Sequence, residues 1–318
     1  MAAAIDVVIP VHGNYELTDS CLARLAAQTV EHRVIVVDDG SPDDTVRRLR
    51  EEWPAVSVVE LAENRGYTQA VNRGVEHGEA EHLVLLNNDV ELRPDFLERL
   101  LAPLRADPRT GSAASLMLAP GERSIDSAGV TADPTLAGFA RLHGRPVEEA
   151  GEGPVLTGPE GTAGAYRRQA WQQVGGLDER IEAYMEILDL ALRLRSAGWQ
   201  SVFVPDAVGV HLGSRSYGRG SARQRRLAGF SRGYLLRRYG VLRGRHGPRA
   251  LITEALVVTA DAALARDLAA LRGRLAGWRA ARGLARHAWP PPAALDATIS
   301  LRDSLALRRR ALAEAPTP

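Results

Sequence analysis

Short apolar runs alternate with amphipathic stretches over the first third of the chain. Four runs are almost continuously apolar, as is typical of strands buried on both faces of a parallel sheet: residues 5–11, 34–37, 56–59 and 83–86. A helix is expected between successive runs, most clearly over residues 17–28, where leucines recur at helical spacing. This alternation predicts an α/β fold with a doubly wound sheet.

Polar side chains follow two of these runs at the point where each run ends. Asp38 and Asp39 follow the second run, and two amides and a carboxylate, residues 87–89, follow the fourth. In an open α/β sheet, ligands bind outside the carboxyl ends of the strands. A carboxylate flanked by amides suits Mg²⁺ or Mn²⁺ carried in on a diphosphate, because the diphosphate brings most of the ligands. The alternative is a polar turn before Pro94, where the next helix is expected to start.

Composition narrows the class of protein. The chain has 318 residues, 45% of them hydrophobic, which is enough for one large core or two modest ones. The formal net charge is +1, and all forty basic residues are arginines. A single cysteine, Cys21, excludes an internal disulfide and fits a reducing compartment. The sequence shows no signal-peptide pattern and no apolar run of about 18 residues. We therefore expect a cytoplasmic protein, at most peripheral on the inner face of the cell membrane.

Several short motifs follow one another over residues 4–215. They are VIPV at 8–11, VVDDGS at 36–41, NRGY at 64–67 with NRG at 72–74, LLNND at 85–89, GGLDE at 175–179, and Asp189-Leu190 through Arg193 to Gly198-Trp199. Their order resembles family 2 glycosyltransferases of the GT-A fold, especially the rhamnosyltransferase-like branch. The resemblance implies a Rossmann-like, doubly wound mixed sheet in a catalytic domain over residues 1–215. Residues 1–110 would form its nucleotide-binding half and 111–215 its acceptor-binding half, followed by a basic, helical C-terminal extension, 216–318.

The resemblance implies that Asp38 and Asp39 bind the nucleoside. A carboxylate can accept hydrogen bonds from the N3–H of uracil or thymine and from ribose hydroxyls. The alternative role of this pair is to cap the following helix. In the family, the loop after the first strand lies against the nucleotide, and the residues in that place are Pro10, Val11 and His12.

Asn64, Arg65 and Gly66 follow the third apolar run. At the carboxyl end of a strand, the planar guanidinium of Arg65 could hold diphosphate oxygens, and Gly66 would let the backbone approach them closely. The alternative is a solvated arginine beside a turn.

Residues 87–89 occupy the place of the family's metal motif. Its last carboxylate, here Asp89, usually binds the divalent ion, while the residue before it, here Asn88, faces the ribose. His211 follows a late strand expected within residues 202–210, where related enzymes have a histidine that reaches the metal or the diphosphate. The alternative for His211 is a half-buried histidine with no ligand.

The expected catalytic base is missing. Family members carry Glu-Asp-x-Asp at the start of the acceptor helix, and the first Asp acts as the base; here that position is Ile187. Inversion at the anomeric carbon needs a carboxylate that removes the acceptor hydroxyl proton, worth roughly 10²–10⁴ in rate. Glu186 and Asp189 are nearby, but helical neighbours point about 100° apart, so neither replaces it without local rearrangement. We take Glu186 as the substitute base and expect Asp189 to pack at the helix start.

The C-terminal part is basic. Residues 207–253 contain eleven arginines and no Asp or Glu, and the arginines between 215 and 238 are interleaved with aromatic residues and leucines. This pattern is typical of membrane-surface binding, and a solvated arginine-rich face is the alternative. No nucleic-acid-binding motif accompanies the charge, so we expect no nucleic-acid partner. Residues 250–287 have apolar positions at helical spacing, which must pack on the catalytic domain, a second subunit of a homodimer, or a bilayer.

These observations predict an inverting glycosyltransferase, a hexosyltransferase of polysaccharide biosynthesis. It would use a nucleoside diphosphate sugar, such as dTDP-rhamnose or a UDP-sugar, with Mg²⁺ or Mn²⁺. The acceptor would be a hydroxyl of a glycan, including a lipid-linked cell-surface glycan. The alternative is a catalytically degenerate partner protein that binds nucleotide or glycan, because Ile187 occupies the base position. A nucleotidyltransferase would want a glycine- and arginine-rich phosphate loop after the first strand, which the sequence lacks.

Overall fold

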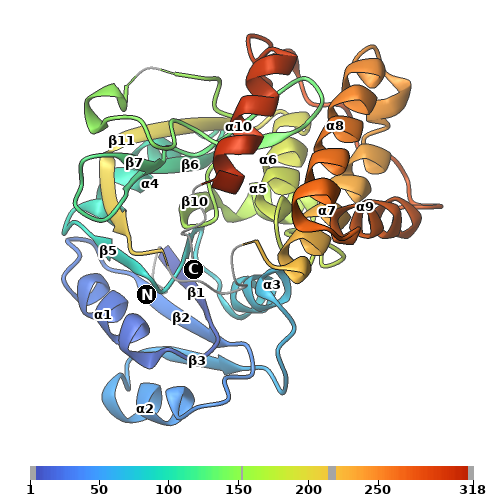
Figure 1. The fold of residues 1–318 in the computed structure, drawn as a ribbon. Helices are drawn as coiled ribbons and strands as arrows, with labels where there is room; N and C mark the ends of the chain where they lie inside the picture. Colours follow the sequence, from blue (N-terminus) through green and yellow to red (C-terminus); the bar gives the residue numbers. More distant parts are fainter. Residues whose placement is uncertain (1–4, 152, 214–219, 314–318) are drawn as a thin grey trace.

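A mixed sheet of nine strands forms the centre of the molecule (Figure 1). The structure is a computed structural model, and it describes residues 5–151, 153–213 and 220–313. Eight strands lie in the order β3-β2-β1-β4-β10-β6-β11-β5, and β7 is added beside β6. Helices cover both faces of this sheet.

The N-terminal half alternates strands and helices as predicted. Its elements are β1 (Ile5–Val11), α1 (Tyr15–Ala26), β2 (Arg33–Asp38), α2 (Thr45–Glu52), β3 (Ser57–Glu60), α3 (Tyr67–His77) and β4 (His82–Leu86). The four strands are parallel. Ile9 of β1 packs in one apolar cluster with Leu22 of α1, and Val8 packs on the opposite face with Val71 of α3. Because both faces are covered, each strand is apolar without alternation.

The second half makes the sheet mixed. Its elements are β5 (Val90–Leu92), α4 (Phe96–Ala106), β6 (Thr110–Leu118), β7 (Ile125–Ser127), β8 (Val130–Ala132), β9 (Gly138–Ala140), η1 (Val147–Glu149), β10 (Ala163–Arg167), α5 (Arg168–Val174), α6 (Glu186–Ser196) and β11 (Gln200–His211). Strand β10 runs antiparallel between β4 and β6, and β11 is antiparallel to β5. A small hairpin, β8–β9, lies outside the main sheet.

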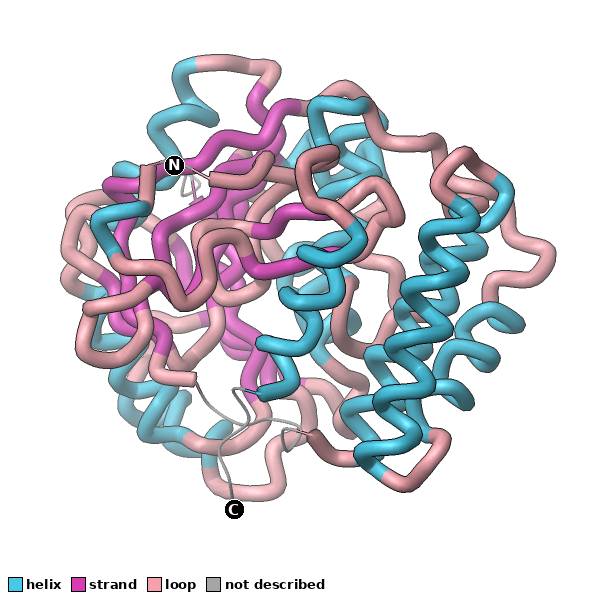
Figure 2. Tube along the Cα trace, turned by 45° about the horizontal axis from the view of Figure 1, so that its top comes forward, coloured by secondary structure: helices cyan, strands magenta, loops and turns pink. Residues whose placement is uncertain are grey.

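A helical group follows the sheet and packs against one side of it (Figures 1 and 2). It contains α7 (Ala222–Arg238), η2 (Val241–Arg243), α8 (Gly247–Ala265), α9 (Ala269–Ala280), η3 (Pro292–Ala294) and α10 (Leu301–Ala313). Tyr234 and Leu235 of α7 share an apolar cluster with Leu188 and Leu192 of α6. The predicted domain boundary at 215–216 lies outside the described residues, as do Arg215 and Arg219. No helix in the described parts of the chain combines the length and apolarity needed to cross a membrane.

Helices α7 and α9 cross at unusually short range. A Cβ atom added to Gly233 would overlap the carbonyl oxygen of Arg274, and one added to Gly277 would overlap that of Phe230. Only glycine allows the two backbones to touch in this way.

The extension is helical as expected, but part of its basic segment does not lie on the surface. Arg232 in α7 is buried, and its Nε donates to Oε1 of Glu254 at 2.7 Å. Burial of an arginine is tolerated because that carboxylate neutralises it. The C-terminal half of α7 is therefore an interior helix and not a segment lying along a membrane.

Candidate functional site

A cleft of about 920 Å³ opens at the carboxyl ends of the N-terminal strands. Its volume is in the range of small-molecule sites. Among the residues predicted from the sequence, those that line it are Pro10, Val11, His12, Asp39, Asn64, Asn88, Asp89, Glu186 and His211. Residues far apart in the chain thus meet in one place, because the strands that carry them end at the same edge of the sheet.

Asp39 joins two loops at the floor of this cleft. Its carboxylate accepts hydrogen bonds from the backbone N–H groups of Arg65, at 2.6 Å, and Gly66, at 2.8 Å. The loops can approach because Gly40 has φ +66° and a Cβ there would lie 2.7 Å from the backbone nitrogen of Asn64. A carboxylate offers about four acceptor positions, so Asp39 keeps capacity for a ligand.

Asp38 faces a different partner. It is buried and accepts hydrogen bonds from the backbone N–H of Ser41, at 3.1 Å, and from the Ser41 hydroxyl. It does not line the cleft. Asp38 therefore closes a turn within the loop after β2 and does not cap α2, which begins at Thr45. A nucleoside contact for Asp38 stays a prediction.

The loop after β3 lies beside the cleft. Asn64 lines it, whereas the exposed guanidinium of Arg65 pairs with Glu63 at 2.7 Å. Gly66 has φ +87° and uses its N–H on Asp39, so its backbone is already committed to the fold. Diphosphate contacts for Arg65 and Gly66 therefore stay predictions.

Asp89 and His211 lie together at the other side of the cleft. Nε2 of His211 is 3.3 Å from Oδ2 of Asp89, and Nδ1 is 2.8 Å from Oδ2 of Asp126. Burial alone would lower the pKa of His211, but hydrogen bonds to Asp126 and Asp89 outweigh it and raise that pKa to about 10. Asn88 donates from Nδ2 to the Thr18 hydroxyl at 2.9 Å.

Glu186 is the first residue of α6, and the backbone before it is strained. Tyr184 and Met185 have φ of 65° and 66°, a left-handed conformation that costs non-glycine residues of order 1 kcal/mol each. Such strain is concentrated at functional sites. Oε2 of Glu186 is buried and has no hydrogen-bond partner among the described residues. Burial raises the pKa of Glu186 to about 7. A hydrogen bond from its own backbone N–H lowers the pKa, and the negative charge of Glu160 raises it further.

The position of the family's base offers no carboxylate. Ile187 is 5% exposed, packs in an apolar cluster with Leu190, and faces Gly161. Asp189 is fully buried, with Arg193 Nε at 2.7 Å and the Tyr239 hydroxyl at 3.1 Å. It does not line the cleft, and its partners are those of a packing residue.

Several residues of the cleft were not predicted. Asp126 lies in β7, within a stretch that has no clear periodicity, so no sequence signal placed it beside His211. Other lining residues that had no assigned role include Tyr67, Phe139 and Arg223. Tyr67 is the last residue of the NRGY motif at 64–67 and could have been placed in the cleft on that ground.

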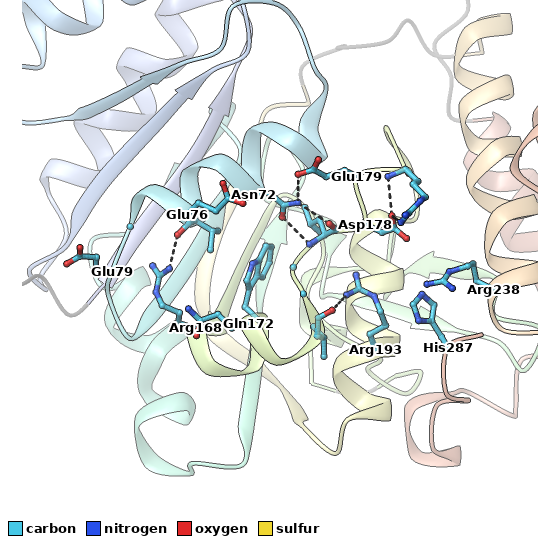
Figure 3. A pocket seen from close by; sticks show the side chains of 18 residues that line it. Asn72, Glu76, Glu79, Arg168, Gln172, Asp178, Glu179, Arg193, Arg238 and His287 are labelled. Atoms are coloured by element: carbon cyan, nitrogen blue, oxygen red, sulfur yellow. Dashed lines mark hydrogen bonds and ion pairs between the residues drawn. The ribbon is translucent and has the colours of Figure 1, made fainter. Parts of the chain in front are cut away.

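A second pocket, of about 1150 Å³, lies among α3, α5 and the loop before α6 (Figure 3). It shares no lining residue with the cleft. Its polar groups serve one another: Asn72 holds the backbone of Leu177 by two hydrogen bonds, and Arg168 donates to Asp6 at 2.7 Å. Arg193 donates to the Val174 carbonyl. This pocket is the larger of the two, but the carboxylate and amide residues at the strand ends lie in the cleft.

Comparison with known proteins agrees with this geometry. The sequence model of the family described as Glycosyl transferase family 2 matches residues 6–175. The chain is 32% identical over 212 residues to N-acetylglucosaminyl-diphospho-decaprenol L-rhamnosyltransferase of Mycobacterium tuberculosis, covering 59% of this chain and 69% of the relative. It is 27% identical to the O-antigen biosynthesis protein RfbC of Myxococcus xanthus, covering 67% of this chain and 17% of that one.

Solved structures share the fold. A mannosyltransferase from Pyrobaculum calidifontis, in complex with GDP-Man and Mn²⁺, matches with a TM-score of 0.55 at 22% identity, covering 92% of this chain and 78% of that one. GalNAc-T7 with UDP, GalNAc and Mn²⁺ matches with a TM-score of 0.59 at 15% identity, covering 80% and 54%. The family match spans more than half of the chain, and the relative from Mycobacterium is covered over two thirds of its length. The chain therefore belongs to glycosyltransferase family 2, in its rhamnosyltransferase-like branch, and is a glycosyltransferase with the GT-A fold.

Proposed function

We propose that this chain transfers a sugar from a nucleoside diphosphate sugar to an acceptor hydroxyl, with inversion at the anomeric carbon. The observation that carries the proposal is that Glu186, with a pKa of about 7, shares one cleft with Asp39 and Asp89. A base and two strand-end carboxylates are the groups that this reaction needs.

Asp39 would hold the nucleoside. It is 5% exposed yet lines the cleft, and two of its acceptor positions are fixed by backbone N–H groups. A carboxylate held in one orientation recognises the positions of hydrogen-bond donors on the base and ribose, which a diffuse negative charge would not do. His12 would add a wall to this subsite, because its Nδ1 lies 2.9 Å from the Asp39 carbonyl oxygen and fixes its ring.

Asp89 and His211 would hold a divalent cation, Mn²⁺ or Mg²⁺. A carboxylate oxygen and an imidazole nitrogen lie 3.3 Å apart at the cleft wall, and Asp126 orients the imidazole from behind. Because the pKa of His211 is about 10 without a cation, Nε2 carries a proton at neutral pH, and a cation would have to displace that proton to bind there. No group of three or more His, Cys, Asp or Glu residues suited to a metal occurs among the described residues. The diphosphate must then supply much of the coordination. When bound, such an ion supplies positive charge that stabilises the departing diphosphate.

Glu186 would act as the base. As the acceptor oxygen forms its bond to the anomeric carbon, the hydroxyl proton passes to the Glu186 carboxylate. The bond between that carbon and the diphosphate oxygen breaks on the opposite face, so the configuration inverts. A pKa near 7 leaves a large share of Glu186 ionised at neutral pH and makes it a stronger base than an ordinary glutamate.

The relative from Mycobacterium is named as a rhamnosyltransferase that acts on N-acetylglucosaminyl-diphospho-decaprenol. By analogy, we assign to this chain dTDP-rhamnose as the first donor to test, UDP-sugars next, and a lipid-linked glycan as acceptor. The protein would then work in the cytoplasm, at the inner face of the membrane.

A panel of nucleotide sugars, with and without Mn²⁺, tests the proposal in two stages. Thermal shift identifies the donor, because a ligand that binds only the folded state raises its melting temperature. Turnover of that donor with an acceptor is then measured for the wild type and for Glu186→Gln. Donor binding without turnover by the wild type would instead support a nucleotide-binding partner protein, the role that Ile187 suggests.

A further inference from the structure

Helix α8 turns an apolar face to solvent. Leu251 is 55% exposed, Ile252 53%, Leu256 49% and Leu264 82%. A surface helix ordinarily directs its apolar stripe to the core and its charges outward. Here the arrangement is reversed, so the apolar face has no partner within the described chain.

The charged residues of α8 point into the protein instead. Glu254 is buried and accepts from Nε of Arg232 and Nε of Arg274, each at 2.7 Å. Asp261 pairs with Arg225 at 3.3 Å. Because its carboxylates are consumed on the inner side, the outer face of α8 carries no charge between Leu251 and Leu264.

The apolar face continues onto the next helix. Leu268, just before α9, is 47% exposed, and Leu275 within α9 is 45% exposed. Six of the eight large apolar side chains that are exposed in the described chain lie between residues 251 and 275. We call these six residues, with the arginines beside them, the α8–α9 surface. A concentration of this size on one side of a molecule marks a contact surface.

The charges around this surface are mostly of one sign. Residues 239–290 are all described and hold three acidic residues: Glu254 and Asp261 face inward, and Asp267, whose side chain is 36% exposed, pairs with Arg225. The exposed basic residues of the same stretch are Arg243, Arg245, Arg266, Arg272, Arg279, Arg282 and Arg286. A second copy of the chain would bring the same arginines face to face, and the one partly exposed carboxylate, Asp267, is already paired with Arg225. An anionic lipid surface offers apolar depth and negative phosphates together.

We propose that the α8–α9 surface lies on an anionic membrane. The leucines and isoleucine enter the boundary between headgroups and acyl chains, and the arginines contact lipid phosphates. Helix α8 lies in the plane of the interface, since no described helix is suited to crossing the membrane. Figure 1 shows α8 and α9 on the outer side of the helical group, away from the sheet. Arg223, near the start of α7, lines the catalytic cleft, so one helix connects the cleft to this group.

This proposal moves the membrane contact from the basic segment to helices within residues 250–287, for which a bilayer was one of three partners expected from the sequence. The expected segment was residues 215–238, but the C-terminal half of α7 is interior. The surface that remains available is the next two helices. The inference suits a lipid-linked acceptor but rests only on the exposed side chains, so it holds whichever donor is used.

Co-sedimentation of the full chain with vesicles tests the proposal. We expect binding to vesicles of phosphatidylglycerol and phosphatidylcholine, weakening as salt is raised, and little binding to phosphatidylcholine alone. The apolar variant is Leu251→Gln with Ile252→Gln and Leu256→Gln. The charge variant is Arg272→Glu with Arg279→Glu. Its matched control is Arg24→Glu with Arg105→Glu, exposed residues of α1 and α4 that give the same change in net charge.

The apolar and charge variants should each lose about tenfold or more in vesicle partitioning, and the control should stay within about twofold of the wild type. Circular dichroism and the thermal shift with nucleotide sugar verify that each variant is folded and keeps its cleft. If the control lost as much vesicle binding as the charge variant, net charge alone would explain the binding, and the proposal would be overturned. Absence of binding by the wild type would also overturn it. A dimer in sedimentation equilibrium that the apolar variant dissociates would assign the surface to a second copy instead. Because vesicle binding needs no turnover, its failure is separate from failure of the catalytic proposal.

Discussion

Nε2 of His211 lies 3.3 Å from Oδ2 of Asp89, although one residue ends β11 and the other follows β4. The two meet because β11 pairs with β5, which begins directly after Asp89. The second ring nitrogen is held by Asp126. Three segments of the chain therefore converge on one imidazole, and its orientation is fixed by the fold before any ligand arrives.

This arrangement predicts that Asp126 controls cation affinity without contacting the cation. Asp126→Ala should weaken Mn²⁺ binding in the presence of a nucleoside diphosphate by about 10–100-fold, because the His211 ring loses its orienting partner. Isothermal titration calorimetry measures the affinity. Asp206→Ala, an exposed carboxylate on the same strand as His211, is the matched control and should bind as the wild type does. Equal affinities for both variants would show that Asp126 has no such role.

The pH dependence of turnover should report Glu186. Only the carboxylate can accept the acceptor proton, so kcat should rise with pH and level off above about 7. Glu186→Gln should lower kcat by roughly 10²–10⁴ and leave the KM of the donor near its wild-type value. Initial rates across a buffer series provide both measurements. A rise of kcat through the same pH range in the variant would assign the titration to another group.

Glu186 should also affect stability, with a defined sign. Its pKa is 4.5 when the side chain is exposed to water without partners, as in the unfolded chain, and about 7 in the folded protein. The stability associated with the neutral form is therefore fully present below pH 4.5 and is lost as pH rises through 7. At pH 8, Glu186→Gln should be more stable than the wild type by up to about 3 kcal/mol of unfolding free energy, and it should unfold at a higher temperature. At pH 4 the two proteins should be equally stable. Calorimetry at both pH values makes this comparison, and a variant less stable at pH 8 would contradict it.

Asp39→Asn should weaken nucleotide binding. The amide has one acceptor oxygen where the carboxylate has two, and the N–H groups of Arg65 and Gly66 bind different oxygens of Asp39. The loop therefore loses one anchor, and the nucleoside loses its charged acceptor. The loss should be about 10–100-fold in Kd, equivalent to one or two charge-assisted hydrogen bonds. Titration with UDP and dTDP measures it. Glu63→Gln, in the same loop but exposed, should change Kd little, and a similar loss there would mean that loop charge alone is responsible.

Asp189 should prove to be a stability residue. Asp189→Ala leaves Arg193 and Tyr239 buried without their carboxylate, which should cost about 3–5 kcal/mol of unfolding free energy. Urea denaturation gives this value. Activity of the protein that remains folded should stay within a few fold of wild type, in contrast to Glu186→Gln. Stable but inactive Asp189→Ala would return Asp189 to the catalytic residues.

The parallel half of the sheet could be predicted because β1, β2 and β4 are largely buried and consist mainly of Val, Ile and Leu. Strand β6 could not, although all nine of its residues are buried. Its first six residues are Thr, Gly, Ser, Ala, Ala and Ser, which fill a narrow space against β10 and β11 and carry no strand signature. Small residues in a central strand are a consequence of close packing that only the assembled sheet reveals.

The residues of the candidate site also fall into those that could be predicted from the sequence and those that could not. Asp39 and Asp89 could be placed in one cleft because both follow strands of the predicted sheet. Asp126 could not, because it comes from a stretch without periodic pattern. Arg232 was expected on a surface because it lies in a run free of acid, but its neutralising carboxylate, Glu254, comes from the next helix. A partner that lies in another helix, 22 residues along the chain, cannot be recognised from the sequence around Arg232.

The left-handed backbone of Tyr184 and Met185 links the stability of the protein to the rate of its reaction. Met185→Gly would adopt the same backbone without the steric cost and relieve of order 1 kcal/mol in the native state. The same glycine would let the segment sample other conformations, so the carboxylate that follows would spend less time facing the acceptor. A hardier protein with a slower reaction is the expected result, and selection for heat tolerance at this segment would work against the enzyme.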